Sequence, residues 1–296
     1  MKKILFLFFL LNAFADAPDP TKPIVIGKMN GRLGNQLFNI AITCALAWDH
    51  DAEPYFPDLS ILENDPVYPD NYRHLLFRCN VTPPSRPISF HMFEPPGGYR
   101  PILFYPDMKT EGWFMSEKYF APHRDRLLEL LAPHPDDLLY VQSNYSWLSK
   151  HSHTVGIPLR VWNEDPTGKY FLQYGKDFLR KAAAFFHEDT IYLVTSNDIE
   201  FAKKVIPAEM RHVVIIEKEP HYIQLLLHTL CKHNIIFNST YSWWAAWLNR
   251  NPNQVVISPD EWFTPGSGPP MEDILPDRWV KIQAKYGPMN DPESYN

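Results

Sequence analysis

Residues 237–249 read Phe-Asn-Ser-Thr-Tyr-Ser-Trp-Trp-Ala-Ala-Trp-Leu-Asn. The short apolar run Asn234–Phe237 predicts a buried strand, and the run Trp243–Leu248 predicts a helix. Between them lies the polar turn Asn238–Ser242. A strand, a polar turn and a helix start in this order present free backbone N–H groups and the positive end of the helix dipole to a ligand. The stretch therefore predicts a phosphate-binding turn, or else an ordinary capped helix in an α/β fold.

The run Asn238–Leu248 resembles the C-terminal motif of glycosyltransferase family 11, the α-1,2-fucosyltransferases and their relatives. Further blocks that resemble this family extend from about Gly27 to Phe263. The resemblance implies an α/β fold of the GT-B type, in which two Rossmann-like lobes enclose a cleft. It also implies that Asn238, Ser239 and Thr240 bind a nucleotide-sugar donor.

A second block begins with the predicted strand Pro23–Gly27 and ends in the helical pattern Leu37–Trp48. The glycines at 31 and 34 allow a tight turn and a close approach to a ligand, although a plain strand-to-helix turn fits equally well. The intervening Gly-Arg-Leu-Gly-Asn-Gln-Leu-Phe resembles the N-terminal motif of the family. This resemblance implies that Gly31 and Gly34 bind the donor and that Asn35 lies near its sugar–phosphate linkage, as a candidate catalytic residue.

The sequence departs from the family pattern at residues 154–163. The family carries His-x-Arg-Arg-Gly-Asp here, and its first arginine grips the donor's pyrophosphate. Arg160 stands at the position of that arginine. Pro158, Val161 and Asn163 stand where the family has the histidine, the second arginine and the aspartate. An arginine after an apolar strand serves either as an anion ligand or as a salt-bridged edge residue. The resemblance favours Arg160 as a donor-binding and catalytic residue.

The predicted strand Thr190–Thr195 is followed by a turn, Ser196-Asn197-Asp198, and by the predicted helix Ile199–Val205. This turn resembles the family block Ser-Asp-Asp or Ser-Asn-Asp. The resemblance implies that Ser196 and Asp198 bind the donor, with Asp198 reading the guanine edge. The alternative is that Asp198 caps the helix.

Strands and helices alternate on both sides of Pro133–His153, which we expect to be a polar connection. The prediction is an N-terminal α/β lobe on the acceptor side, residues 24–150, and a C-terminal lobe on the nucleotide-sugar side, residues 151–263. Residues 264–296 form a loose tail in this prediction, in which Ile274–Tyr286 packs as a helix. Ligands of such folds lie beyond the carboxyl ends of the strands.

Two further segments carry no assigned role. Residues 51–100 are rich in Pro, Tyr and Asn and predict loops and short elements over which an acceptor lies. Residues 111–120 resemble a family block with an aromatic segment between the lobes. The glutamates in it, Glu111 and Glu117, are either catalytic or incidental charges on a core strand and turn.

The first fifteen residues have the order of a secretory signal. A basic start, the apolar run Ile4–Leu11 and the small-x-small site Ala13–Ala15 follow one another. The apolar run is short for a membrane span, so we predict a signal cleaved after Ala15, with an uncleaved signal-anchor as the alternative. Either reading predicts the secretory pathway, with a secreted, periplasmic or membrane-anchored product.

Composition excludes some function classes. The formal net charge of −6 over 296 residues comes with no basic footprint, which argues against a nucleic-acid partner. Three scattered cysteines give neither a disulfide framework nor a zinc site, although one bridge remains open: Cys44, Cys79 and Cys231. Three sequons occur, the last of them expected to be too buried for glycosylation: Asn80, Asn144 and Asn238.

Together with these features, the resemblance to family 11 implies an inverting transferase that moves fucose from GDP-fucose to a hydroxyl of a glycan acceptor, with α-1,2 linkage. No Asp-x-Asp pair follows an apolar strand, so we expect no metal and no other cofactor, and Arg160 and the helix start at Ser239 would meet the diphosphate charge. The altered strand leaves two alternatives open. One is a transferase for another nucleotide sugar, and the other is a catalytically impaired protein that binds GDP or carbohydrate.

Overall fold

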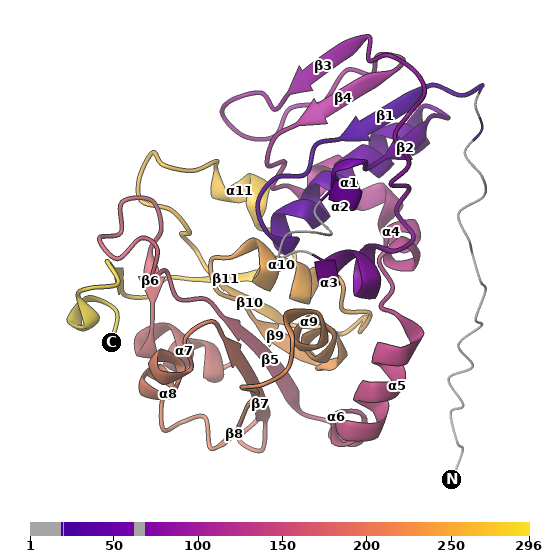
Figure 1. Ribbon diagram of the computed structural model, residues 1–296. Helices are drawn as coiled ribbons and strands as arrows, with labels where there is room; N and C mark the ends of the chain where they lie inside the picture. Colours follow the sequence, from indigo (N-terminus) through magenta and orange to yellow (C-terminus); the bar gives the residue numbers. More distant parts are fainter. Residues whose placement is uncertain (1–18, 20, 62–68) are drawn as a thin grey trace.

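A computed structural model describes residues 19, 21–61 and 69–296 (Figure 1). The predicted signal or anchor, residues 1–15, lies outside this part of the chain. Among the described residues, no helix combines the length and the apolar composition needed to cross a bilayer. The predicted secretory location therefore stays a prediction.

Residues before 112 supply the strands of a first parallel sheet, ordered β2-β1-β4-β3. Its strands are β1 (Ile24–Gly27), β2 (Glu53–Tyr55), β3 (Phe90–Phe93) and β4 (Met108–Glu111). The helices of this lobe are α1 (Leu33–Asp49), α2 (Asp58–Ile61), α3 (Pro69–Asn71), η2 (Tyr72–Leu76), η3 (Glu117–Tyr119), η4 (Ala121–His123) and α4 (Arg124–Leu130). The short elements between β2 and β3 confirm the irregular region predicted there, apart from residues 62–68, which lie outside the described part.

Residues after 153 supply a second parallel sheet, ordered β11-β10-β9-β5-β7-β8. Its strands are β5 (Thr154–Leu159), β7 (Ile191–Ser196), β8 (His212–Ile215), β9 (His233–Ile235), β10 (Val256–Pro259) and β11 (Val280–Ile282). The helices between them are α7 (Lys176–Ala183), α8 (Ile199–Val205), α9 (His221–Leu230) and α10 (Thr240–Trp247). The two predicted α/β lobes are therefore confirmed, and Figure 1 shows them one above the other.

One hydrophobic cluster spans the two lobes. Helix α10 follows a strand of the second sheet, yet it packs against α1 of the first lobe. The Trp243 ring lies 4.6 Å from the Phe38 ring, and the Trp244 ring stacks on Phe120 at 5.5 Å. Together with Trp247, these side chains are almost fully buried. The tryptophan run is thus core, because large aromatic rings bury the most apolar area.

The segment Pro133–His153 is not the polar connection expected from its sequence. It folds into α5 (Pro135–Asn144) and α6 (Trp147–Lys150), and Val141 and Leu148 are buried. The polar residues that suggested a loop are instead a helix start, because His134 Nδ1 accepts a hydrogen bond from the Asp136 backbone N–H.

The C-terminal residues do not form a loose tail, and no helix spans Ile274–Tyr286. That stretch carries β11 and β12 (Tyr286–Gly287), flanked by α11 (Met271–Ile274) and η5 (Pro292–Ser294), and β12 pairs with β6 (Gln173–Tyr174). Val280 and Ile282 alternate with Lys281, which is the period of a strand. The alternation is only three residues long, whereas the apolar pattern that predicts a helix covers the whole stretch.

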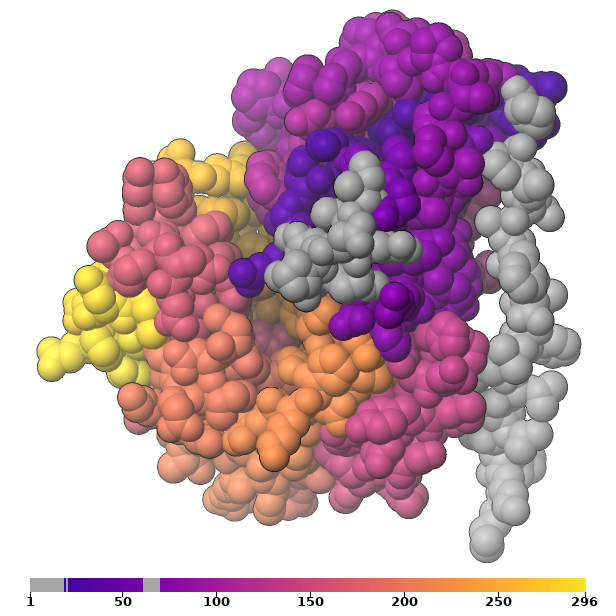
Figure 2. All heavy atoms as spheres, in the orientation of Figure 1, coloured from indigo at the N-terminus to yellow at the C-terminus, as the bar shows by residue number. Residues whose placement is uncertain are grey.

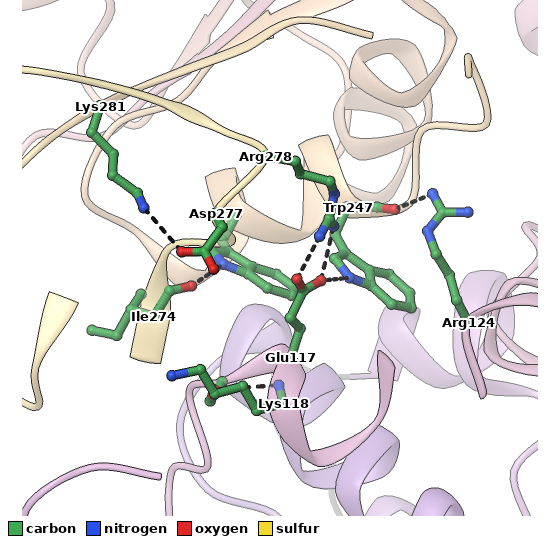
Figure 3. A network of polar contacts seen from close by, with 10 residues as sticks. Glu117, Lys118, Arg124, Trp247, Ile274, Asp277, Arg278 and Lys281 are labelled. Carbon is green, nitrogen blue, oxygen red and sulfur yellow. Dashed lines mark hydrogen bonds and ion pairs between the residues drawn. The ribbon is translucent and has the colours of Figure 1, made fainter. Parts of the chain in front are cut away.

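Glu117 ties this C-terminal segment to the first lobe (Figure 3). The two terminal guanidinium nitrogens of Arg278 donate to the Glu117 carboxylate, and Trp247 Nε1 donates to the same carboxylate at 2.9 Å. Arg124 donates to the Trp247 carbonyl oxygen at 2.9 Å. These contacts give Glu117 a structural role, which favours the alternative in which it is not catalytic.

No described cysteine forms a disulfide, and all three thiols are buried. Burial raises the pKa of Cys79 and of Cys231 to about 12. Asn238 is 2% exposed, which confirms that its sequon is too buried to carry a glycan.

A buried histidine makes stability sensitive to acid. His228 Nε2 bonds Thr195 Oγ1 at 2.7 Å, Nδ1 has no partner in the described structure, and burial lowers the His228 pKa to about 3. Between pH 6 and pH 4, His228 binds a proton in the unfolded chain and stays neutral in the folded chain. Acid therefore lowers the free energy of unfolding by up to about 1.4 kcal/mol per pH unit. Urea unfolding measured at several pH values in this range should show that the free energy of unfolding of His228→Leu depends less steeply on pH. The exposed His187→Leu variant should keep the wild-type slope, and an unchanged slope in His228→Leu would contradict the assignment.

Candidate active site

A cavity of about 950 Å³ lies between the lobes, within the size range of small-molecule sites. The carboxyl ends of the strands of both sheets open toward it, which is where α/β folds bind ligands. Figure 2 shows the purple residues of the first lobe above the orange residues of the second. Eight predicted site residues line it: Gly31, Gly34, Asn35, Arg160, Ser196, Asn238, Ser239 and Thr240.

The starts of helices α1 and α10 meet at the cavity wall. Thr240 Oγ1 donates to Asn35 Oδ1 at 2.8 Å, across the two lobes. A Cβ on Gly34 would lie 2.4 Å from the Tyr241 backbone nitrogen, so only glycine permits this approach. No side chain caps either helix start, which leaves both N-termini available to an anion.

Two arginines, one from each lobe, line the same cavity. Arg160 follows β5, and Arg32 is the first residue before α1. Burial lowers the pKa of Arg160, the adjacent Glu164 opposes that shift, and the positive charge of Arg32 adds to it. Two cations that line one cavity favour binding of a multivalent anion.

Arg160 is also ion-paired within the cavity. Its guanidinium binds the Glu164 carboxylate and lies 4.7 Å from the centre of the Trp162 ring. Glu164 lines the cavity as well and is half exposed. Arg160 is therefore salt-bridged, as one of its two alternatives predicts, and it lines the cavity, while its role as an anion ligand stays a prediction.

We expect removal of the Glu164 charge to strengthen anion binding. In Glu164→Gln the competing carboxylate is gone, so GDP affinity should rise by about fivefold to tenfold, with the gain shrinking at high salt. Isothermal titration at two salt concentrations measures this. Glu209→Gln removes the partner of Arg180 on the surface and should change nothing. Weaker GDP binding in Glu164→Gln would show that Glu164 orients Arg160 instead of competing for it.

Asp198 does not line the cavity. Its Oδ1 accepts from the Phe201 backbone N–H at 2.9 Å, which caps α8, and its Oδ2 accepts from Asn163 Nδ2 at 3.2 Å. Asn197 lines the cavity instead, with its amide held on both backbone groups of Val161 at 2.8 and 2.9 Å. Of the two alternatives for Asp198, the structure has the helix cap, and guanine reading stays a prediction.

Two buried polar atoms on cavity-lining residues have no hydrogen-bond partner among the described residues. Asn238 Nδ2 donates to two backbone carbonyl oxygens at 2.7 and 2.9 Å, but its Oδ1 has no partner. Trp162 Nε1 also lacks one, and the Trp162 ring stacks on Phe171 at 3.6 Å. Both atoms are buried beneath the cavity surface, so a ligand in the cavity would reach them only after the wall rearranges.

Sequence reasoning missed several lining residues. Arg32 lies inside the quoted glycine motif, and its place between two glycines at a helix start was a usable signal. His221 lines the cavity from α9 and bonds Asn71 of the other lobe, a long-range contact with no local signal. In the described part of the chain, no group of His, Cys, Asp or Glu side chains is arranged to hold a metal ion.

Three comparisons with known proteins place the chain. The profile of "Glycosyl transferase family 11" matches residues 103–283, more than half of the chain. The O-antigen biosynthesis glycosyltransferase WbnK of Escherichia coli is 26% identical over 57% of this chain and 59% of its own length. An alpha-1,2-colitosyltransferase of Escherichia coli is 28% identical over 58% of this chain and 61% of its own. The chain thus spans about three fifths of the length of these relatives.

The fold comparison agrees. The NodZ alpha-1,6-fucosyltransferase of Bradyrhizobium superposes with a TM-score of 0.52 at 12% identity, covering 77% of this chain and 92% of NodZ. That likeness shows the two-lobed GT-B arrangement and nothing about substrate. With a profile match over more than half of its length and this fold, the chain belongs to glycosyl transferase family 11.

Proposed function

We propose that the protein is an inverting glycosyltransferase that moves fucose from GDP-fucose to a hydroxyl of a glycan acceptor, with α-1,2 linkage. The observation that carries this proposal is the meeting of Arg32, Arg160 and the uncapped starts of α1 and α10 at one cavity. A diphosphate carries the charge that these groups bind best.

The same groups supply the catalysis. As the glycosidic bond breaks, negative charge grows on the leaving diphosphate, and preorganised donors bind that charge more strongly than they bind the ground state. Arg160 and the N–H groups at the start of α10 lie on the C-terminal lobe, while Asn35 and Arg32 approach from the other lobe. Because groups of both lobes bind the diphosphate, the attached sugar is held in a fixed position for attack by the acceptor hydroxyl.

The sugar is the least constrained part of the proposal. One relative is named alpha-1,2-colitosyltransferase, and another, from Ateles belzebuth, is named galactoside alpha-(1,2)-fucosyltransferase 1 and is 30% identical over 38% of this chain. These names favour α-1,2 transfer and leave another deoxysugar donor as the alternative. The replacement of the family's histidine, second arginine and aspartate by Pro158, Val161 and Asn163 favours the further alternative of a binding protein with impaired turnover.

A thermal-shift screen of GDP, UDP and CMP tests the donor. A ligand at about 100 times its Kd stabilises the folded state by about 2.7 kcal/mol, so GDP should raise the melting temperature while UDP and CMP should not. The GDP shift should survive EDTA, because arginines and backbone N–H groups bind the diphosphate in this proposal. A shift with UDP or CMP alone would overturn the donor, and a shift that requires manganese or magnesium would overturn metal independence.

Release of GDP from GDP-fucose then separates turnover from binding. Binding of GDP without any transfer or hydrolysis would favour the impaired-protein alternative. Proton NMR of the product distinguishes inversion from retention at the anomeric carbon, and a retained configuration would contradict the mechanism.

A further inference from the structure

A second cavity, of about 450 Å³, opens where strands β1, β3 and β4 of the first lobe end. Its lining residues are Asn30, Gly31, Phe93, Glu94, Glu111, Gly112 and Trp113. Gly31 and Trp113 also line the inter-lobe cavity, so the two cavities adjoin. The smaller one lies within the size range of small-molecule sites.

The backbone of the turn that carries Trp113 is held in place by contacts that need no ligand. The Glu94 carboxylate accepts from the backbone N–H groups of Trp113 and Phe114 at 2.7 and 2.9 Å, and Asn30 Nδ2 donates to the Gly112 carbonyl oxygen at 3.2 Å. Phe114 is fully buried and has a φ of 47°, a backbone conformation that persists only where the surroundings enforce it. The turn thereby presents the Trp113 indole, 49% exposed, at the junction of the two cavities.

The smaller cavity differs from the larger one in charge. Phe93 is 61% exposed and supplies a second apolar surface, while Glu94 and Glu111 supply carboxylates. No lysine or arginine is among its lining residues within the described chain, whereas Arg32 and Arg160 line the inter-lobe cavity. Both Glu94 oxygens are bound to the turn, so Glu111, paired with His91 at 3.0 Å, is the group left to meet a ligand.

We infer that this smaller cavity, here called the acceptor pocket, binds the terminal pyranose of an uncharged glycan. The C–H face of the sugar would lie on the Trp113 indole, and its hydroxyls would donate to the Glu111 carboxylate. The inference rests on the proposed function, since the adjoining inter-lobe cavity would hold the donor whose sugar is transferred. Uronic and sialic acids would bind poorly, because their carboxylates would face Glu94 and Glu111 in a pocket that no lysine or arginine of the described chain lines.

Saturation-transfer NMR on the full chain tests the pocket without requiring transfer. The probes are methyl β-galactoside and methyl β-glucuronide, each measured with and without GDP. We expect saturation on the ring protons of the galactoside and none on the glucuronide. Trp113→Ala should weaken galactoside binding by at least about tenfold, while Trp113→Phe should retain most of it.

Two phenylalanines of β3 give a matched pair of variants. Phe93→Ala should weaken galactoside binding, whereas Phe90→Ala, exposed on the same strand and outside both cavities, should not. Absence of galactoside binding, equal binding of the glucuronide, or full binding by Trp113→Ala would each overturn the inference. The proposed function is judged separately by GDP binding in the wild type, so galactoside binding without GDP binding would sink that function and leave the pocket standing.

Discussion

Replacing Arg160 by lysine should lower kcat by about a hundredfold, on the order of 3 kcal/mol of transition-state stabilisation. Lysine keeps the charge but loses the planar pair of donors that matches a diphosphate. Ser239→Ala should cost much less, because its side chain makes no cap hydrogen bond and the backbone N–H groups of α10 remain. GDP affinity should change modestly in both variants. Steady-state kinetics of fucosyl transfer, with GDP titrations alongside, measures the split.

The matched control is Arg180→Lys, which alters a surface arginine paired with Glu209 and should turn over as the wild type does. If Arg160→Lys also turns over normally, Arg160 is structural in this chain and the altered strand has moved the phosphate site. A fall in GDP affinity with kcat unchanged would instead mean that Arg160 binds ground state and transition state equally.

Gly34→Ala should destabilise the fold by about 3 kcal/mol, the upper end of the usual cost of overpacking. The added methyl group would meet the backbone of Thr240 and Tyr241, which cannot turn aside as a flexible side chain can. Helices α1 and α10 would have to separate, which should also break the hydrogen bond from Thr240 to Asn35. Urea unfolding and GDP titration together report the expected loss of stability and of affinity.

Gly266→Ala is the control for that substitution. A Cβ there meets no atom within 4 Å, but its φ of 80° disfavours alanine, so a cost of about 1 kcal/mol with unchanged GDP affinity is expected. Wild-type stability and GDP binding in Gly34→Ala would contradict the close approach of the two helix starts.

The sequence predicted the parts of the fold whose signal is local. The apolar runs around Ile24–Gly27 and Ile191–Ser196 became buried strands, since a parallel sheet covered on both faces leaves little room for polar residues. The segments at Pro133–His153 and after Thr264 differ from the prediction because their local signals are short and contacts distant in sequence stabilise their helices and strands. Trp279, for example, is buried against Trp243, which no local pattern reveals.

The part of the candidate site that the sequence predicted is the part where glycines are required by the backbone. Gly31 has a φ of 63° and Gly34 has no room for a side chain, so both glycines are explained by conformation or packing. The pairing of Arg160 with Glu164 and the turn that fixes Trp113 were not predictable. They depend on where side chains of one lobe meet the cavity or the other lobe, and spacing along the chain does not encode that.

A crystal structure with GDP tests the central claim most directly. The diphosphate should lie in the inter-lobe cavity, bound by Arg160 and Arg32 and by backbone N–H groups at the start of α10, with Glu164 displaced from Arg160. A diphosphate held elsewhere, or in the cavity with the Arg160–Glu164 pair intact and no contact to either arginine, would contradict the account.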